Sequence, residues 1–360
     1  MTTVSSRFLS ILPAYFGGKR TLAPWIFNTL QHAIPQKEWD QSEFIDLFMG
    51  GGSISLFAKT QGFKKICAVD CAGRSKIVAE AALMNGTLRL QRSHLLYLSQ
   101  PIPTNQKPGL VESMYSPSVF SCRHAQILDQ WLYWANQVQN TTLKALMKLV
   151  IWRCIYRFIC IPTSVNTSNR PFAEALDGIR SWDSLNPKRF IDGSLDSLLI
   201  PSCDWLTKEI KTVNQGLFSG APISFHQADA LNILPNLQGD ILYADPPYAH
   251  TSAYEKTFAV IDHLLTGHKQ VTPSSFSKST ESLDTLFDSV RHLPTWMLSY
   301  GNQVLDLNAL IALVQRHAGS RKVQGFAKAY KHLAHVSKSN HNQELLIIAS
   351  TERKVISYAN

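Results

Sequence analysis

The chain has 360 residues, of which 45% are hydrophobic and 17% are charged, a composition typical of a globular protein with one large domain or two smaller ones. No apolar run is long enough to span a bilayer, and the N-terminus lacks the basic start and small-residue cleavage site of a secretory signal. Lysine and arginine outnumber aspartate and glutamate by 35 to 26, so the net charge of +9 favours a polyanionic partner without establishing one. Because the sequence shows neither a membrane span nor a secretory signal, we expect a cytoplasmic protein. Its six cysteines lack paired CxxC spacing, so reduced thiols are expected rather than a zinc site or a disulfide framework.

Short apolar runs alternate with helical patterns along the chain. The runs predict strands at residues 43–48, 64–70, 239–245, 295–302 and 343–350. Helical patterns lie between several of them, at residues 20–33, 54–62, 279–293 and 307–318. This alternation predicts an α/β fold with a doubly wound, mainly parallel sheet. In such a sheet ligands bind at the carboxyl ends of the strands.

The middle of the chain interrupts this alternation. Residues 124–161 carry a long helix-like pattern, and a polar, turn-rich sequence follows at residues 162–178. We therefore predict that residues 86–221 form an inserted, largely helical second domain. Residues 1–85 and 222–360 are predicted to form the domain that contains the sheet.

A glycine turn follows the first predicted strand, in "DLFMGGGS" from Asp46 to Ser53. Glycines allow the backbone to turn tightly and approach a ligand, and the helix that follows offers free N–H groups. The pattern is neither the dinucleotide fingerprint GxGxxG nor a P-loop, so by itself it is as consistent with a structural turn. Asp70, eighteen residues after Gly52 at the end of the next predicted strand, suits a ribose diol. The alternative for Asp70 is a helix N-cap.

The sequence "DPPY", from Asp245 to Tyr248, follows the third predicted strand. Two prolines restrict the backbone and supply no N–H donors, so the loop is stiff and its carbonyl groups can accept hydrogen bonds. Together, the Asp245 carboxylate and the Pro246 carbonyl can accept both hydrogens of an exocyclic NH₂ group, while Tyr248 stacks on the base. Such a clamp would direct the nitrogen lone pair toward an electrophile. The alternative is an ordinary turn with the aspartate as a cap.

Several short motifs occur in an order that resembles the α-group (D12) family of adenine-N6 DNA methyltransferases, which includes the bacterial DNA adenine methylases. They are "YFGGK" (Tyr15 to Lys19), "DLFMGGGS", Asp70, "ADA" (Ala228 to Ala230), "DPPY" and "LSYGN" (Leu298 to Asn302). Each motif is short, but their joint order is specific. The resemblance covers about residues 10–85 and 222–350. It implies a Rossmann-like methyltransferase fold and S-adenosylmethionine as the methyl donor.

The resemblance also implies roles for individual residues. Those expected to bind the cofactor are Tyr15, Gly17, Gly18, Lys19, Asp46, Phe48, Gly50, Gly52, Ser53, Asp70, Asp229 and Asp245. Within this set, Tyr15 and Lys19 belong to the segment beside the methionine end, and Asp229 would bind the adenine amine of the cofactor. The implied catalytic residues are Asp245, Pro246, Pro247 and Tyr248. No metal is required. Ala14 departs from the family, in which a basic residue often precedes the aromatic one.

The inserted region resembles the family least, because "NTSNRPFAEA" stands where relatives often carry a hairpin with "FNVPFG". The target sequence therefore cannot be inferred from the resemblance. Candidate DNA-binding residues are Asn169 and Arg170 in this region and Lys328 and Lys331 near the last predicted strand. Solvated surface residues are the alternative for both pairs. Arg153 and Arg157 lie in an apolar helical pattern, where arginines commonly flank a core.

The expected function is methyl transfer to the N6 amine of a flipped-out adenine in double-stranded DNA. A cognate restriction or phage-defence protein is a candidate partner. Cytosine-N4 methylation is one alternative, although those enzymes usually carry serine in place of Asp245. Protein glutamine methylation is another, although those enzymes typically carry asparagine there. A DNA-binding regulator that has lost catalysis is the alternative from a different class of protein.

Overall fold

The computed structural model describes residues 6–15, 17–103, 109–116, 119–158, 202–249, 258–268, 274–330 and 342–351. The chain divides into two compact units. Unit 1 comprises Met1–Phe16, Ala72–Ser219 and Tyr254–Thr272, and unit 2 comprises Gly17–Cys71, Gly220–Ala253 and Pro273–Asn360. Nearly all of the predicted insertion, residues 86–221, falls in unit 1.

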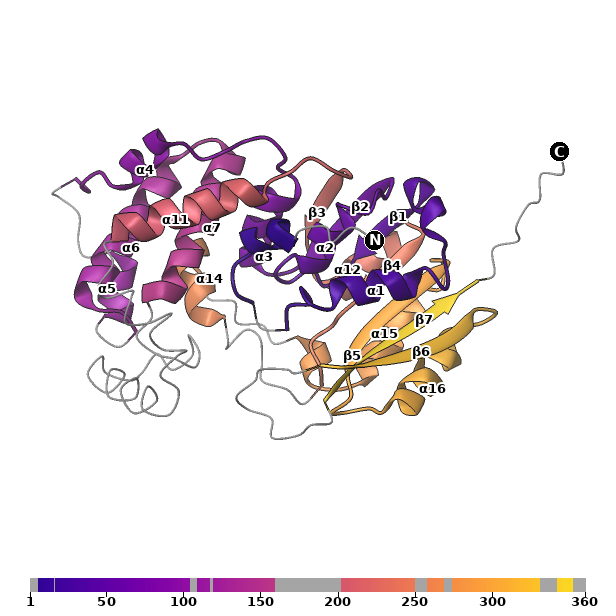
Figure 1. The fold of residues 1–360 in the computed structure, drawn as a ribbon. Coiled ribbons are helices and arrows are strands. Elements are labelled where there is room, and N and C mark those ends of the chain that lie inside the picture. Colours follow the sequence, from indigo (N-terminus) through magenta and orange to yellow (C-terminus); the bar gives the residue numbers. More distant parts are fainter. Residues whose placement is uncertain are drawn as a thin grey trace, which may run out of the picture. The chain divides into compact units, whose positions relative to one another are not determined.

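Unit 2 contains a seven-stranded sheet with the strand order β3-β2-β1-β4-β5-β7-β6 (Figure 1). Its strands are β1 (Glu43–Asp46), β2 (Lys65–Asp70), β3 (Ile223–Gln227), β4 (Ile241–Ala244), β5 (Thr295–Gly301), β6 (Lys322–Ala329) and β7 (Gln343–Ser350). Neighbouring strands from β3 to β5 are parallel, whereas β7 is antiparallel to both β5 and β6. The predicted α/β fold with a mainly parallel sheet, consistent with a Rossmann-like methyltransferase fold, is confirmed.

All five predicted strands are present, and β3 and β6 are two further strands that no apolar run predicts. Both are edge strands, and most of their side chains are partly or fully exposed. The sequence of β3, "ISFHQ", ends in two polar residues, and that of β6, "KVQGFAKA", contains two lysines and a glycine. An edge strand needs little apolar surface, so its sequence lacks the continuous apolar run that marks a central strand.

The centre of the sheet contains a reversal of strand order. From β1 the chain adds β2 and then β3 on one side, and it returns to place β4 on the other side of β1. The register pairs Asp46 with Ala68 of β2 and with Tyr243 of β4. Ligands of doubly wound sheets bind where the strand order reverses, at the carboxyl ends of the strands. In this sheet that position is the carboxyl end of β1 and β4.

Each face of the sheet packs against its own helices within unit 2. On one face Phe44 and Tyr243 pack with α1 (Ala23–Leu30) and α2 (Ser53–Ala58). On the other face Ile45 and Leu242 pack with α12 (Ala230–Ile233), α15 (Glu281–Ser289) and α16 (Leu307–His317). Adjacent residues point to opposite faces because side chains alternate along a strand. Burial on both faces fixes the register of β1 and β4, and so the positions of the loops that follow them.

Unit 1 is mainly helical among its described residues. Its α-helices are α3 (Gly73–Val78), α4 (Arg92–Leu98), α5 (Leu110–Tyr115), α6 (Cys122–Gln137), α7 (Thr141–Phe158), α11 (Ser202–Gly216) and α14 (Ala259–Thr266). Within it, α7 packs against both α6 and α11 (Figure 1). The remaining short helices are η1 (Ser6–Ile11) and η3 (Ala79–Leu83) in unit 1, and η2 (Gln36–Gln41), η5 (Leu234–Asn236) and η6 (Ser275–Ser277) in unit 2. No helix in the described ranges has the length and apolarity needed to cross a membrane.

Arg153 has a structural role in unit 1. Its Nη1 donates to the carbonyl oxygens of Ser10 at 2.7 Å and Leu12 at 2.6 Å. Its Nε donates to Oε2 of Glu209, a carboxylate that is 2% exposed, at 2.6 Å. Arg153 therefore joins α7 to α11 and to the N-terminal segment, in agreement with the interpretation that it flanks a core. The side chain of Arg157 lies outside the description.

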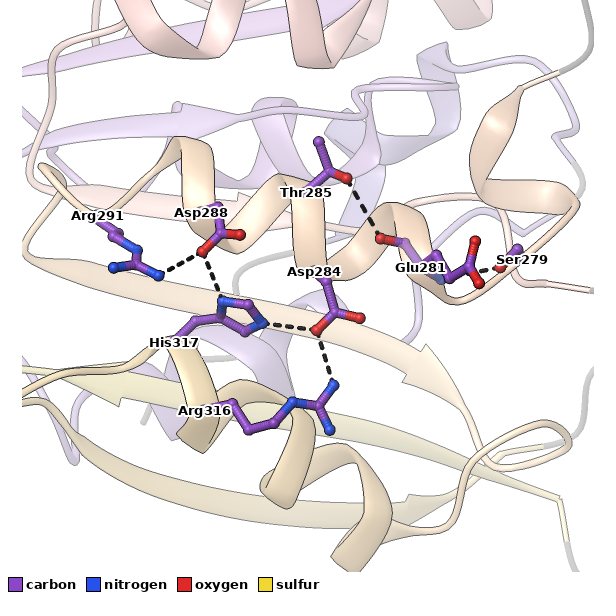
Figure 2. Close-up of polar contacts among 8 residues, drawn as sticks. All are labelled: Ser279, Glu281, Asp284, Thr285, Asp288, Arg291, Arg316 and His317. Atoms are coloured by element: carbon purple, nitrogen blue, oxygen red, sulfur yellow. Dashed lines mark hydrogen bonds and ion pairs between the residues drawn. The ribbon is translucent and has the colours of Figure 1, made fainter.

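A cluster of charged side chains joins α15 and α16 at the surface of unit 2 (Figure 2). His317 lies between two carboxylates, with Nε2 2.7 Å from Oδ1 of Asp284 and Nδ1 2.9 Å from Oδ1 of Asp288. Arg316 donates to the same oxygen of Asp284, and Arg291 donates to the same oxygen of Asp288. Partial burial would raise the pKa of Asp284, but hydrogen bonds from Arg316 and His317 outweigh it and lower the pKa. The hydrogen bond from Arg291, followed by that from His317, lowers the pKa of Asp288.

These lowered pKa values predict a loss of stability in acid. A carboxyl group with a lower pKa in the folded state stabilises the fold above its unfolded-state pKa of about 3.9, and the contribution is lost as the pH falls through the folded-state pKa. We expect the double variant Asp284→Asn, Asp288→Asn to melt at a lower temperature than the wild type at pH 7, with a smaller difference at pH 3. Thermal melting followed by circular dichroism checks this. A difference in melting temperature that is the same at pH 7 and pH 3 would contradict a stabilising role for the charges of Asp284 and Asp288.

Candidate active site at the carboxyl ends of β1, β2 and β4

Three carboxylates stand at the carboxyl ends of neighbouring strands in unit 2. Asp46 ends β1, Asp70 ends β2 and Asp245 follows β4. Asp46 is buried, which raises its pKa to about 7; a hydrogen bond from Ser55 opposes the shift, and the charges of Asp245 and Asp70 add to it. The edge of the sheet therefore concentrates negative charge, and a cation bound there would relieve the repulsion.

The glycine turn between β1 and α2 is tied to one of these carboxylates, Asp70. Gly50 and Gly52 have φ values of +52° and +78°, which residues with a side chain rarely adopt. The N–H of Gly50 donates to Oδ2 of Asp70 at 2.7 Å. Asp70 therefore supports the turn.

Asp46 stabilises the start of α2 through hydrogen bonds from Ser55. Its Oδ2 accepts hydrogen bonds from the Ser55 N–H at 3.0 Å and the Ser55 hydroxyl at 2.6 Å. Its Oδ1 is buried and accepts no hydrogen bond within the described part of the chain. A buried carboxylate oxygen without a donor is costly, and a donor supplied by a ligand would remove that cost.

Lys19 connects the "YFGGK" segment to the two loops. Its backbone N–H donates to Oγ of Ser53, the first residue of α2 after the glycine turn, at 3.1 Å. Its ammonium group, only 3% exposed, lies 2.8 Å from Oδ1 of Asp245 and 2.9 Å from the hydroxyl of Tyr248. Motifs separated by more than two hundred residues thus meet through one side chain. The buried ammonium is opposite in charge to the Asp245 carboxylate, which only accepts hydrogen bonds when ionised.

The ring of Tyr248 is held by the "LSYGN" motif at the end of β5. It lies 4.7 Å from the ring of Tyr300, centroid to centroid. A Cβ atom on Gly301 would come within 2.9 Å of the Tyr248 ring, so the ring can approach the backbone only because this residue is glycine. The hydroxyl of Tyr300 accepts from the N–H of Ala249, directly after the "DPPY" sequence. Tyr300 and Gly301, the last two residues of β5, therefore set the position of the loop that follows β4.

Glu344, at the start of β7, is a further residue of this cluster that none of the sequence motifs contains. Its side chain is completely buried, and Oε1 accepts from Ser299 at 2.7 Å and from Tyr248 at 2.9 Å. Lys19 Nζ lies 3.4 Å from the same oxygen. The sequence does contain one indication of this residue, an acid at the start of the apolar run "QELLIIAS". Buried carboxylates are rare unless they are paired, so an acid at that position indicates a paired carboxylate.

The other residues predicted for the site have varied positions. Phe48 packs edge-on against Phe276, with ring centroids 5.0 Å apart. Asp229 caps α12 through the N–H groups of Leu231 and Asn232, so its side chain has at least a structural role. In unit 1, Tyr15 stacks on Phe258 with ring centroids 4.5 Å apart.

Of the predicted DNA-binding residues, Lys328 lies within the described part of the chain. Lys328 lies on β6 with its ammonium 5.6 Å from the centroid of the Trp25 ring. Asn169, Arg170 and Lys331 lie outside the described residues. Within the described ranges, no group of three or more histidine, cysteine, aspartate or glutamate side chains could hold a metal ion.

The chain is similar in sequence to known methyltransferases. The family model "D12 class N6 adenine-specific DNA methyltransferase" matches residues 15–187. The chain is also similar to the Type II methyltransferase M2.HphI of Haemophilus parahaemolyticus, with 25% identity over 345 residues, which cover 93% of this chain and 96% of that protein. These matches confirm the family resemblance predicted from the motifs and support DNA methyltransferase activity.

Proposed function

We propose that this chain, a relative of the D12 class of N6 adenine-specific DNA methyltransferases, transfers a methyl group from S-adenosylmethionine to the N6 amine of a flipped-out adenine. The observation that carries the proposal is the position of Asp245 and Tyr248. They follow β4 directly beside the glycine turn that follows β1, where the strand order reverses. A clamp for an amine and a turn suited to a nucleotide thus share one edge of the sheet.

The residues at this edge suit S-adenosylmethionine. The cofactor supplies an electrophilic methyl group on a sulfonium, and it also carries an ammonium group. Burial raises the pKa of Asp46, and the negative charges of Asp245 and Asp70 add to that rise, so a ligand with positively charged groups is favoured here. Asp46 Oδ1 is a buried acceptor that an ammonium group could satisfy. In this proposal the glycine turn approaches the methionine part, and Asp70 accepts from the ribose as well as from Gly50.

The remaining predicted cofactor contacts belong to the same proposal. Gly17, Gly18 and Lys19 would border the methionine end, together with Tyr15. Phe48 and Ser53 would border the cofactor from the glycine turn, and Asp229 would accept from the adenine of the cofactor.

The clamp acts on the target adenine. Asp245 and the Pro246 carbonyl accept the two amine hydrogens, which orients the nitrogen lone pair toward the methyl group. Pro247 keeps the loop rigid, and Tyr248 stacks on the base. The adenine must leave the duplex first, because its amine is otherwise paired and buried. Orientation and fixed charges account for the rate enhancement in this scheme.

Methylation of DNA by the purified protein tests the proposal. The protein is incubated with S-adenosylmethionine and a random-sequence duplex library, and modified bases are located by sequencing. N6-methyladenine at a defined sequence is expected. N4-methylcytosine would indicate the alternative specificity, and binding of DNA without any modified base would indicate a regulator. A cognate restriction or phage-defence protein stays a proposed partner.

The region between the two segments of the sheet domain is proposed to read the target sequence. We predict that replacing Asn169 and Arg170 together by alanine shifts or relaxes the preferred site while the affinity for S-adenosylmethionine is unchanged. The physical reason is that an amide and a guanidinium beside a proline-stiffened turn can both make bidentate contacts to base edges. The same library experiment checks this.

The pattern of loss distinguishes the other roles for this turn. A uniform loss at all sites would indicate a phosphate contact, and an unchanged profile would indicate a surface turn. The same two outcomes would contradict base readout by Asn169 and Arg170. The parallel variant Lys328→Ala, on β6, is expected to weaken methylation of all sites equally if Lys328 contacts phosphate.

A further inference from the structure

The carboxylate of Glu344 connects four segments around the proposed clamp. One oxygen, Oε1, receives the Ser299 hydroxyl of β5 and the Tyr248 hydroxyl of the loop after β4, and Lys19 Nζ is near. The register of β7 places Glu344 opposite Gly301, the glycine against which the Tyr248 ring packs. The position of this carboxylate is therefore fixed by the sheet itself.

A carboxylate at this position has no obvious role in packing. The next residues of β7 are Leu345, Leu346, Ile347 and Ile348, and all are buried in the apolar core. Burial of a charge is unfavourable unless its partners compensate for the lost water, so an apolar residue would serve the core better. What the carboxylate provides is an acceptor directed at Tyr248 and Lys19.

The Tyr248 hydroxyl has one hydrogen and two carboxylates within reach. It accepts a hydrogen bond from Lys19 at 2.9 Å, so its own hydrogen is directed elsewhere. Oε1 of Glu344 lies at 2.9 Å, whereas Oδ1 of Asp245 lies at 3.5 Å. The shorter contact gives the hydrogen to Glu344. Without Glu344, the nearest carboxylate oxygen for that hydrogen is the one on Asp245.

We propose that Glu344 is a positioning residue that holds the Tyr248 hydroxyl hydrogen away from Asp245. Asp245 then keeps its capacity to accept the hydrogens of the target amine, and the Tyr248 ring keeps the tilt at which the base stacks. This inference rests on the proposed methyl transfer. It adds a third charged residue to the Lys19–Asp245 pair, contributed by the antiparallel end of the sheet.

A double-mutant cycle between Glu344 and Tyr248 tests the proposal. The rate constant kcat and the KM values for DNA and S-adenosylmethionine are measured for the wild type, Glu344→Gln, Tyr248→Phe and the double variant. Glu344→Gln is expected to lower kcat by a factor on the order of 10 to 100, because a small misorientation of reacting groups is enough for such a loss. Both KM values should be unchanged.

The double variant gives the specific readout. Phenylalanine has no hydroxyl hydrogen to place, so the loss caused by Glu344→Gln should be much smaller in the Tyr248→Phe background. Independent, multiplying losses would overturn the proposal, as would a near-normal kcat of Glu344→Gln or an effect on KM alone. Absence of methyl transfer by the wild type would instead overturn the proposed function, so the two failures are distinguishable.

Two further variants separate positioning from folding. Glu209→Gln changes another buried, ion-paired glutamate, the partner of Arg153 in unit 1, and is expected to lower the melting temperature without lowering kcat. Ser299→Ala removes a donor to the same Glu344 oxygen and serves if Glu344→Gln does not fold. It should lower kcat by a smaller factor, and this loss should again shrink in the Tyr248→Phe background. An equal loss in both backgrounds would overturn the proposal.

Discussion

Replacement of Asp245 by asparagine is expected to lower the rate of methyl transfer by at least a factor on the order of 10² to 10³, the scale of losing one preorganised electrostatic contact in an active site. Asparagine keeps the shape of the side chain but replaces one carboxylate oxygen by an NH₂ group, which repels the hydrogens of the target amine. It also leaves the buried ammonium of Lys19 without the carboxylate 2.8 Å away. Binding of DNA should persist, because attraction to phosphates dominates affinity.

The measurement is single-turnover transfer of a labelled methyl group, with DNA binding followed by fluorescence anisotropy. Asp240→Asn is the matched control. Asp240 lies immediately before the start of β4, where its carboxylate accepts from the Glu43 N–H. Because this is the opposite end of the strand from Asp245, the rate of the Asp240→Asn variant should be unchanged. A near-normal rate for Asp245→Asn would show that this carboxylate does not orient the amine. Loss of DNA binding together with the rate would show that the change disturbs the fold.

Replacement of Asp70 by alanine is expected to weaken binding of S-adenosylmethionine by about 1–3 kcal/mol, the usual range for removal of a charged hydrogen-bond partner. This corresponds to a factor of about 5 to 150 in the dissociation constant. The structure gives two reasons for the loss. Asp70 is the proposed ribose acceptor, and its Oδ2 also accepts from Gly50, so the glycine turn loses a support as well.

Isothermal titration separates these two contributions. Asp70→Asn keeps an oxygen that can accept from the Gly50 N–H but removes the charge, so it should lose less affinity than Asp70→Ala. Asp284→Asn, on the α15 surface of unit 2, is the control for removal of a carboxylate and should bind normally. An unchanged dissociation constant for Asp70→Ala would restrict Asp70 to supporting the turn without contacting the cofactor.

The sequence determined the central part of the sheet and the loops at its edge. β4 is a continuous apolar run and β7 contains one, because both faces of these strands are buried, and such runs are recognisable without any knowledge of their partners. The motifs "DLFMGGGS" and "DPPY" are readable for the same local reason. Positive φ requires glycine, and a rigid loop with free acceptors requires proline.

Only the tertiary structure decided which side chains meet. The strand order places β1 beside β4, and this order cannot be read from local patterns. Lys19 stays a predicted neighbour of the methionine end of the cofactor. Only the structure shows that its ammonium contacts Asp245 and Tyr248 and that its backbone N–H donates to Ser53 at the start of α2. Glu344 was missed because the strand that carries it is antiparallel. An antiparallel strand brings its start, rather than its end, to the edge where the parallel strands β1, β2 and β4 finish, and no pattern within "QELLIIAS" shows that direction.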